Sequence, residues 1–298
     1  MYNKTHLNVL VSYAYLAKDE KLMSKLKELT TQGTVNLMID SGAFTRHNSK
    51  QDMNHINVAD YSEWLKDMKN YCEKYVMLDV IGNAPQSRKN YEQMLDAGLN
   101  PMYVATIFDK DFDYIRHAVE LNPDICVAGG ATDKSLWMTR RYQEVYRETH
   151  GKARMHGLGY TSFPRMLQHK LRSVDSSTWK TAAARFGQSF IFCNKQTYRI
   201  RAAEIFSGQR TFPPVVRQKF EELGITPKLY MKKESHYGEN SLDFFINIVC
   251  AVEMQKYCLK HGLEYFLACG ALKDLEKLVY VSEHLKTITY GSFVRAFQ

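Results

Sequence analysis

The sequence predicts a (β/α)8 barrel of the TIM type, followed by a mostly helical C-terminal region. Eight short apolar runs recur along the first two thirds of the chain, separated by polar segments of helical character. This alternation is the pattern of repeated βα units. Three of the runs carry an aspartate at or near their carboxyl end, and aspartate is a residue that buried strands disfavour. A length of 298 residues with 45% hydrophobic content suits one large α/β domain or two small ones.

The predicted strands are short and mainly apolar. In chain order they are Leu7 to Ser12, Val35 to Asp40, Tyr75 to Val80, Pro101 to Ile107, Ile125 to Gly129, Arg154 to Gly159, Ser173 to Ser177 and Ser189 to Cys193. The helices predicted between them are Lys18 to Leu29, Val58 to Cys72, Ser87 to Ala97, Asp111 to Leu121, Lys134 to Thr149 and Ser162 to Lys170. Eight strands with intervening helices close into a barrel more naturally than they form an open sheet.

The remainder of the chain is predicted to be mostly helical. Its clearest element runs from Ser241 to His261, where a dense apolar pattern ends at Gly262 and indicates a buried helix. The segment from Gly208 to Pro214 is the most linker-like stretch, because glycine and proline gather there. The expected division is therefore a catalytic barrel over residues 1–208 and a helical region over 209–298 packed on it.

Asp40, Asp79 and Asp175 each lie at or near the carboxyl end of an apolar run. One explanation is local, since aspartate readily caps a helix or turns the chain. The other explanation is functional, because the carboxyl ends of barrel strands converge on the catalytic face. Three acids on separate strands favour the second explanation, and we take the trio as the first candidate site.

The net charge of the chain and the placement of its basic residues indicate the kind of partner it binds. The formal charge of +8, from 40 Lys and Arg against 32 Asp and Glu, favours a polyanionic partner. Basic and aromatic residues mix in the middle of the chain, as suits phosphate contacts and base stacking, although a solvated helix face with core aromatics is an equal alternative for any one of them. The candidates for nucleic-acid binding are Trp179, Lys180, Arg185, Lys195 and Arg199.

The cysteines and the hydropathy pattern indicate a reduced, cytoplasmic protein. Six cysteines are scattered without a Cys-x-x-Cys pair or a Cys/His cluster at zinc-ligand spacing, so we expect no metal site. No run of 18 apolar residues occurs, and the N-terminus lacks a long apolar signal region. We therefore expect no membrane contact.

Enzymes that catalyse displacement at the anomeric carbon of a sugar usually do so with a pair of carboxylates. One acid forms a covalent glycosyl intermediate while the other moves a proton on or off the departing group. The trio holds one acid more than this minimum. The third carboxylate can read a nucleobase by accepting hydrogen bonds from its N–H edge.

The segments around the acids resemble those of tRNA-guanine transglycosylases. Asp40 to Phe44, Asp-Ser-Gly-Ala-Phe, resembles their Asp-Ser-Gly-Gly-Phe segment, and Val174 to Trp179 resembles their nucleophile strand. Ala128 to Ala131 resembles their glycine-pair loop, and His156 to Gly159 resembles the segment before the nucleophile strand. The resemblance covers roughly residues 35 to 180.

The resemblance implies a role for each acid. Asp175 is the implied nucleophile, Asp40 the general base and acid, and Asp79 the reader of the base. Further base-binding positions are implied at Ser41, Gly42, Phe44, Gly129, Gly130, His156 and Gly157. From the residues alone, His156 is equally a satisfied core histidine, whereas for Phe44 and Trp179 core packing is favoured over stacking on a base.

Two departures from the family affect the choice of substrate. The Cys-x-Cys-x-x-Cys and distal histidine that hold zinc in the tRNA enzymes are missing, as is a clear Gln-Gly-Gly segment after the fourth strand. A compact chain without the zinc element looks more like the phage-type DNA-guanine transglycosylases. The resemblance then implies a pentosyltransferase that exchanges guanine in DNA for a free 7-deazaguanine such as preQ0, without a cofactor, in the host cytoplasm if the chain is phage-encoded. The alternatives are a tRNA-guanine transglycosylase, a base-hydrolysing glycosylase and an inactive nucleic-acid-binding barrel.

Overall fold

The computed structural model describes residues 6–48, 56–128, 135–160 and 163–297. The chain divides into two compact units. The first comprises Met1–Ser176 and His261–Leu275, and the second comprises Ser177–Lys260 and Glu276–Gln298. These units do not coincide with the expected division into 1–208 and 209–298, because the chain returns to the first unit for one more strand.

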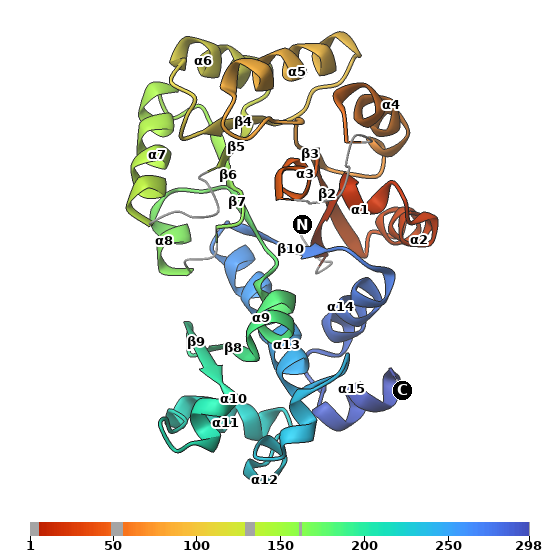
Figure 1. Cartoon of the computed structure of the whole chain (residues 1–298), viewed down its shortest axis with the longest axis vertical. Coiled ribbons are helices and arrows are strands. Elements are labelled where there is room, and N and C mark those ends of the chain that lie inside the picture. The colour runs from red at the N-terminus through yellow and green to blue at the C-terminus, as the bar shows by residue number, and fades with distance from the viewer. Residues whose placement is uncertain (1–5, 49–55, 129–134, 161–162, 298) are drawn as a thin grey trace. The chain divides into compact units, whose positions relative to one another are not determined.

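The first unit is built on a curled parallel sheet of eight strands (Figure 1). The strands are β1 (Leu7–Ser12), β2 (Val35–Asp40), β3 (Lys74–Tyr75), β4 (Tyr103–Thr106), β5 (Asp124–Ala128), β6 (Arg154–Gly157), β7 (Ser173–Ser176) and β10 (Glu264–Cys269). Their order across the sheet is β3-β2-β1-β10-β7-β6-β5-β4. The two strands at the edges are thus consecutive in the chain, as in a (β/α)8 fold.

The edges of this sheet meet at a single point among the described residues. An isolated parallel bridge pairs Val76 with Met102. Its backbone hydrogen bonds run from Met77 N–H to Met102 O (3.1 Å) and from Met102 N–H to Tyr75 O (2.9 Å). The sheet therefore curls as a barrel does, but no continuous ladder of the described residues closes it.

The helices of this unit lie around the outside of the sheet, except for the short α3 (Ala43–Asn48), which Figure 1 draws among the strands. The others are α1 (Tyr13–Leu16), α2 (Glu20–Thr31), α4 (Val58–Met68), α5 (Ala84–Asp96), α6 (Phe112–Leu121), α7 (Ser135–Glu148) and α8 (Phe163–Gln168). The starts of five of them are fixed by side chains that accept a backbone N–H of the first turn, namely Ser12, Asp19, Asn57, Asn83 and Asp111. Such caps satisfy donors that the helix itself cannot pair.

Burial explains the position of the central strands. All six residues of β1 are buried, and Val9, Val11, Ile39 and Leu267 on β1, β2 and β10 are 0% exposed. Parallel strands covered on both faces require such near-continuous apolar runs. The bounds predicted for the first two strands are confirmed by β1 and β2.

The prediction for the eighth strand is wrong. Ser189 to Cys193 falls in β8 (Gln188–Cys193), which pairs antiparallel with β9 (Gln196–Arg201) in a separate sheet of two strands. The eighth strand of the main sheet is β10, which pairs in parallel with both β1 and β7. A two-residue turn causes the difference, because Asn194 and Lys195 adopt positive φ angles of 47° and 59° that reverse the chain at once.

The second unit is mainly helical. Besides the β8–β9 hairpin it contains α9 (Thr178–Phe186), α10 (Ala202–Phe206), α11 (Pro214–Glu222), α12 (Pro227–Tyr230), η1 (Lys233–His236), α13 (Leu242–Lys260), most of α14 (Leu272–His284) and α15 (Tyr290–Ala296). The predicted buried helix Ser241 to His261 is confirmed by α13. Among the described residues, no helix combines the length and apolarity needed to cross a membrane.

Candidate active site

Asp175 lies near the carboxyl end of β7 and is 9% exposed. Its Oδ1 accepts the backbone N–H of Gly159 at 2.7 Å and lies 3.2 Å from Nε2 of His156. Within the described ranges Oδ2 has no hydrogen-bond donor. The carboxylate is therefore held by one oxygen, while the other is available for chemistry.

His156 is fully buried on β6, and its two ring nitrogens face two partners. Nδ1 lies 2.8 Å from Oγ of Ser173, its neighbour in the β6–β7 register, and Nε2 faces Asp175. A carboxylate oxygen accepts hydrogen bonds, so this geometry suits the tautomer in which the Nε2–H group donates a hydrogen bond to Oδ1 of Asp175. The hydroxyl of Ser173 can donate to Nδ1 and fix this orientation of the ring. His156 therefore contacts Asp175, the candidate nucleophile, and is not positioned to contact a bound base.

Asp40 ends β2, beside Ser12 at the end of β1. Its Oδ2 accepts the backbone N–H of Gly42 at 3.0 Å, and the Ser12 hydroxyl also hydrogen-bonds to the carboxylate. Gly42 has a φ of +85°, and a Cβ built there would lie 2.7 Å from Cβ of Ala14. Only glycine fits this close approach without strain. The backbone turn therefore presents an N–H to Asp40.

The three acids influence one another electrostatically. Burial raises the pKa of Asp40 to about 6, opposed by the Gly42 N–H and supported by the charge of Asp175. Burial raises the pKa of Asp79, which follows β3, to about 7, and the charge of Asp40 adds to this effect. Carboxylates with pKa values near neutrality are suited to proton transfer at physiological pH.

The charges of all three acids also act on one buried thiol. Cys126 lies on β5 in register with His156. Burial raises the pKa of this thiol, and the charges of Asp40, Asp175 and Asp79, in that order, raise it further. The structure thus brings together the three acids that the sequence places on separate strands.

The other predicted base-binding residues fall into different environments. Ser41 is 0% exposed, and its Oγ has no hydrogen-bond partner among the described residues. Phe44, on α3, is 55% exposed. Gly157 has no room for a side chain, because a Cβ there would lie 2.8 Å from Oη of Tyr142. Gly129 and Gly130 lie outside the described residues.

The predicted nucleic-acid-binding residues all belong to the second unit. Trp179 is 1% exposed and packs edge-on against Phe244, with ring centroids 5.7 Å apart. The structure therefore places Trp179 in the core of that unit and not on a surface that could stack on a base. Lys180 is partly buried, whereas Arg185, Lys195 and Arg199 are exposed.

Sequence reasoning missed the partners of the acids. Ser12, Ser173 and Gly159 contact Asp40, His156 and Asp175, respectively. The sequence signal for Gly159 was its place in the His156 to Gly159 segment. Serines inside apolar strands give no comparable signal, because nothing in the sequence tells which side chain each will face.

A buried ion-pair network follows β4 and also has no sequence signal. Asp109 is 1% exposed and accepts hydrogen bonds from Nη2 of Arg88 (3.0 Å) and Oη of Tyr103 (2.5 Å). Nη2 of Arg141 donates to the backbone carbonyl of Asp109 at 2.8 Å. These bonds fix the segment after β4.

In comparisons with known proteins, the chain matches no family model and no curated protein. The described residues contain no group of three or more His, Cys, Asp and Glu arranged to hold a metal ion. The site thus rests on its geometry: a clamped carboxylate, two further acids of raised pKa, and a buried histidine.

Proposed function

We propose that the protein is a DNA-guanine transglycosylase that exchanges guanine for a 7-deazaguanine base through a covalent Asp175–nucleotide intermediate. The observation that carries this proposal is the asymmetry of Asp175, whose Oδ1 is occupied by two donors while Oδ2 is left for attack. A scaffold of the (β/α)8 type supports it, since such folds collect catalytic groups at the carboxyl ends of their strands. We also propose that the sheet closes fully as a barrel and that the enzyme acts in the cytoplasm.

In the first displacement, Oδ2 of Asp175 attacks C1′ of the target deoxyguanosine as the C1′–N9 bond breaks. The bonding electron pair goes to N9, which takes a proton from the Asp40 carboxyl group. Because the pKa of Asp40 is raised to about 6, both its protonated and ionised forms are populated near neutral pH. Guanine leaves, and Asp40 remains as a carboxylate.

In the second displacement, the incoming 7-deazaguanine gives its N9 proton to Asp40. N9 then attacks C1′, the C1′–Oδ2 bond breaks, and its electron pair returns to Asp175. Two inversions restore the original β-configuration. Throughout, the donors from Gly159 and His156 stay on Oδ1 and stabilise the carboxylate as it leaves.

Asp79 is proposed to read the base. When ionised, it accepts hydrogen bonds from N–H groups on the Watson–Crick edge of guanine or of a 7-deazaguanine. Its pKa is raised to about 7 in the protein without a base. Donors from a bound base favour the ionised form and lower this pKa, so binding of the base and ionisation of Asp79 support each other.

The choice of DNA over tRNA rests on the missing zinc-ligand cysteines. The target nucleotide must leave the helical stack to reach Asp175, as it does for other enzymes that act on a base. Exposed basic residues such as Arg185 and Arg199 in the second unit suit contacts with the phosphate backbone.

The test is incubation of the purified protein with guanine-containing DNA and labelled preQ0, followed by mass spectrometry of the nucleosides. We expect label in DNA with the wild type and none with Asp175→Asn, while the exposed-site control Asp67→Asn retains activity. Label in tRNA but not in DNA would refute the assignment of DNA. Abasic sites formed without any added base would instead identify a hydrolase.

A further inference from the structure

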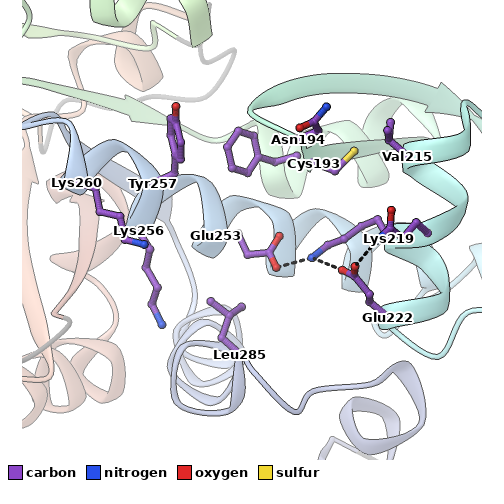
Figure 2. Close-up of a pocket in the computed structure, with 12 residues that line it drawn as sticks. Cys193, Asn194, Val215, Lys219, Glu222, Glu253, Lys256, Tyr257, Lys260 and Leu285 are labelled. Atoms are coloured by element: carbon purple, nitrogen blue, oxygen red, sulfur yellow. Dashed lines mark hydrogen bonds and ion pairs between the residues drawn. The ribbon is translucent and has the colours of Figure 1, made fainter.

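The second unit contains a cavity of about 710 Å³ that the proposed exchange reaction does not use. It lies between α11 and α13 at the turn of the β8–β9 hairpin (Figure 2). Cavities of this size hold small organic ligands. Four of its lining residues share one face of α13, at helical spacing: Glu253, Lys256, Tyr257 and Lys260.

At one end of the cavity, the positive charge of a lysine is balanced by two glutamates. Nζ of Lys219, on α11, lies 2.5 Å from Oε1 of Glu253 and 3.8 Å from Oε2 of Glu222 (Figure 2). Both glutamates therefore face the same ammonium group. This end has no excess positive charge to offer a ligand.

The other end of the cavity is lined by Lys256 and Lys260. Nζ of Lys256 donates to the backbone carbonyl of Ser282 at 3.2 Å, which leaves two of its three donors for another partner. Burial and the neighbouring Lys286 lower the pKa of the Lys256 ammonium group, and the charge of Glu253 opposes this effect. Among the described residues, neither Lys256 nor Lys260 forms an ion pair. An anion bound here would offset the repulsion between Lys256 and Lys286.

An aromatic pair lies next to these lysines. The rings of Phe192 and Tyr257 are 5.5 Å apart at 59° to each other, and both residues line the cavity. Tyr257 directly follows Lys256 and precedes Lys260 by less than one helical turn (Figure 2). The aromatic pair and the two lysines thus line the same cavity.

We propose that this cavity is a nucleotide-binding site, in which Lys256 and Lys260 hold a phosphate and the Tyr257 ring stacks on the base. Ammonium groups bind phosphate as point charges, and base stacking on an aromatic side chain tolerates any base. The ligand is either a free mononucleotide or one nucleotide of a strand. The inference does not depend on the exchange reaction, because it uses none of the strand-end acids.

The test measures the affinity of the full chain for 5′-GMP, guanosine, inorganic phosphate and a short single-stranded oligodeoxynucleotide by calorimetry. We expect saturable binding of 5′-GMP that is tighter than that of guanosine or phosphate alone. Lys256→Gln and Lys260→Gln should each weaken it about tenfold, as expected for one lost charged contact. The exposed Lys228, on α12, provides the matched control Lys228→Gln.

The Tyr257 ring is tested in the same way. Tyr257→Phe should retain binding, whereas Tyr257→Leu should weaken it, because only the first keeps a stacking surface. Tighter binding of the oligonucleotide than of 5′-GMP, lost in the same variants, would identify a strand as the source of the nucleotide. The proposal is overturned if neither 5′-GMP nor the oligonucleotide binds saturably, or if the Lys256 and Lys260 variants match Lys228→Gln while circular dichroism shows them to be folded.

Discussion

At the scale of single residues, two glycines position the candidate catalytic acids. Gly42 and Gly159, with φ angles of +85° and +62°, present backbone N–H groups to Asp40 and Asp175, respectively. Because glycine has no side chain, each donor is a backbone group that neither titrates nor changes rotamer. The acids are thus held by the backbone, which favours a preorganised site.

The first expected outcome concerns Gly42. Gly42→Ala adds a Cβ to a residue of positive φ and places it 2.7 Å from Cβ of Ala14. We expect a loss of about 2 to 4 kcal/mol in the free energy of unfolding, measured by chemical denaturation. The control is Gly98→Ala, which has a similar φ of +75° but open space around it, and should lose only about 1 kcal/mol. Equal losses in the two variants would show that the contact with Ala14 is absent.

The second expected outcome concerns the charge of Asp40. Its folded-state pKa of about 6 lies above the ordinary value of 3.8, so ionisation at neutral pH opposes folding. We expect Asp40→Asn to raise the free energy of unfolding by about 1 to 3 kcal/mol at pH 7. The gain should shrink as the pH falls below about 6 and vanish below the ordinary pKa, where both states hold the proton.

Denaturation curves at several pH values test this expectation. The exposed carboxylate of Asp67, on α4, gives the control Asp67→Asn, for which we expect little dependence on pH. A gain for Asp40→Asn that persists unchanged at low pH would contradict a buried charge as its cause.

The sequence allowed the acids to be predicted but not their partners. An aspartate at the end of an apolar run departs from strand preferences, and that departure is visible in one sequence. Ser12 and Ser173 give no such signal, because small polar residues are tolerated in strands. The burial of Trp179 against Phe244 depends on contacts between distant segments, which residue composition does not encode.

At the scale of elements, the sequence predicted strands better than their pairing. β8 and β10 are both runs of six residues with buried centres. Length and hydrophobicity therefore did not distinguish a hairpin strand from a central strand of the parallel sheet. The two strands differ because a tight turn at Asn194 and Lys195 follows β8, whereas α13 returns the chain to the sheet at β10. The sequence pattern alone did not show which of the two strands joins the parallel sheet.

The free edge of the β8 strand gives a third expected outcome. Asn247, on α13, accepts a hydrogen bond from the backbone N–H of Phe190 and donates one to the carbonyl of Gln188 at 3.1 Å. Asn247→Ala leaves two backbone groups without these partners, and we expect a loss of about 2 to 4 kcal/mol in stability. Leu259→Ala, at an exposed position of the same helix, should cost less than about 1 kcal/mol.

Hydrogen exchange locates the effect of the Asn247 substitution. The amide of Phe190 should lose protection in Asn247→Ala and keep it in Leu259→Ala. Unchanged protection at Phe190 would show that the side chain of Asn247 does not support the strand.

At the scale of the whole molecule, the first unit is discontinuous in sequence. Its sheet needs β10, which pairs with both β1 and β7 and which lies beyond the entire α13 helix. The expected barrel over residues 1–208 would lack this strand and expose two strand edges in the middle of the sheet. Unpaired edges of this kind favour aggregation over folding.

The fourth expected outcome follows from this arrangement. A chain truncated after residue 208 should not fold cooperatively, whereas the full chain should. Near-ultraviolet circular dichroism and thermal unfolding measure the difference. A cooperative transition in the truncated chain would show that the first 208 residues are a self-sufficient domain.

The most direct test of the proposed function is the capture of its covalent intermediate. The protein is mixed with a guanine-containing oligodeoxynucleotide in the absence of an incoming base and denatured, and the adduct is digested and mapped by mass spectrometry. We expect a nucleotide ester on Asp175, formed by the wild type and by Asp67→Asn but not by Asp175→Asn. Guanine exchange that persists in Asp175→Asn, or an adduct on another residue, would contradict the assignment of Asp175 as the nucleophile.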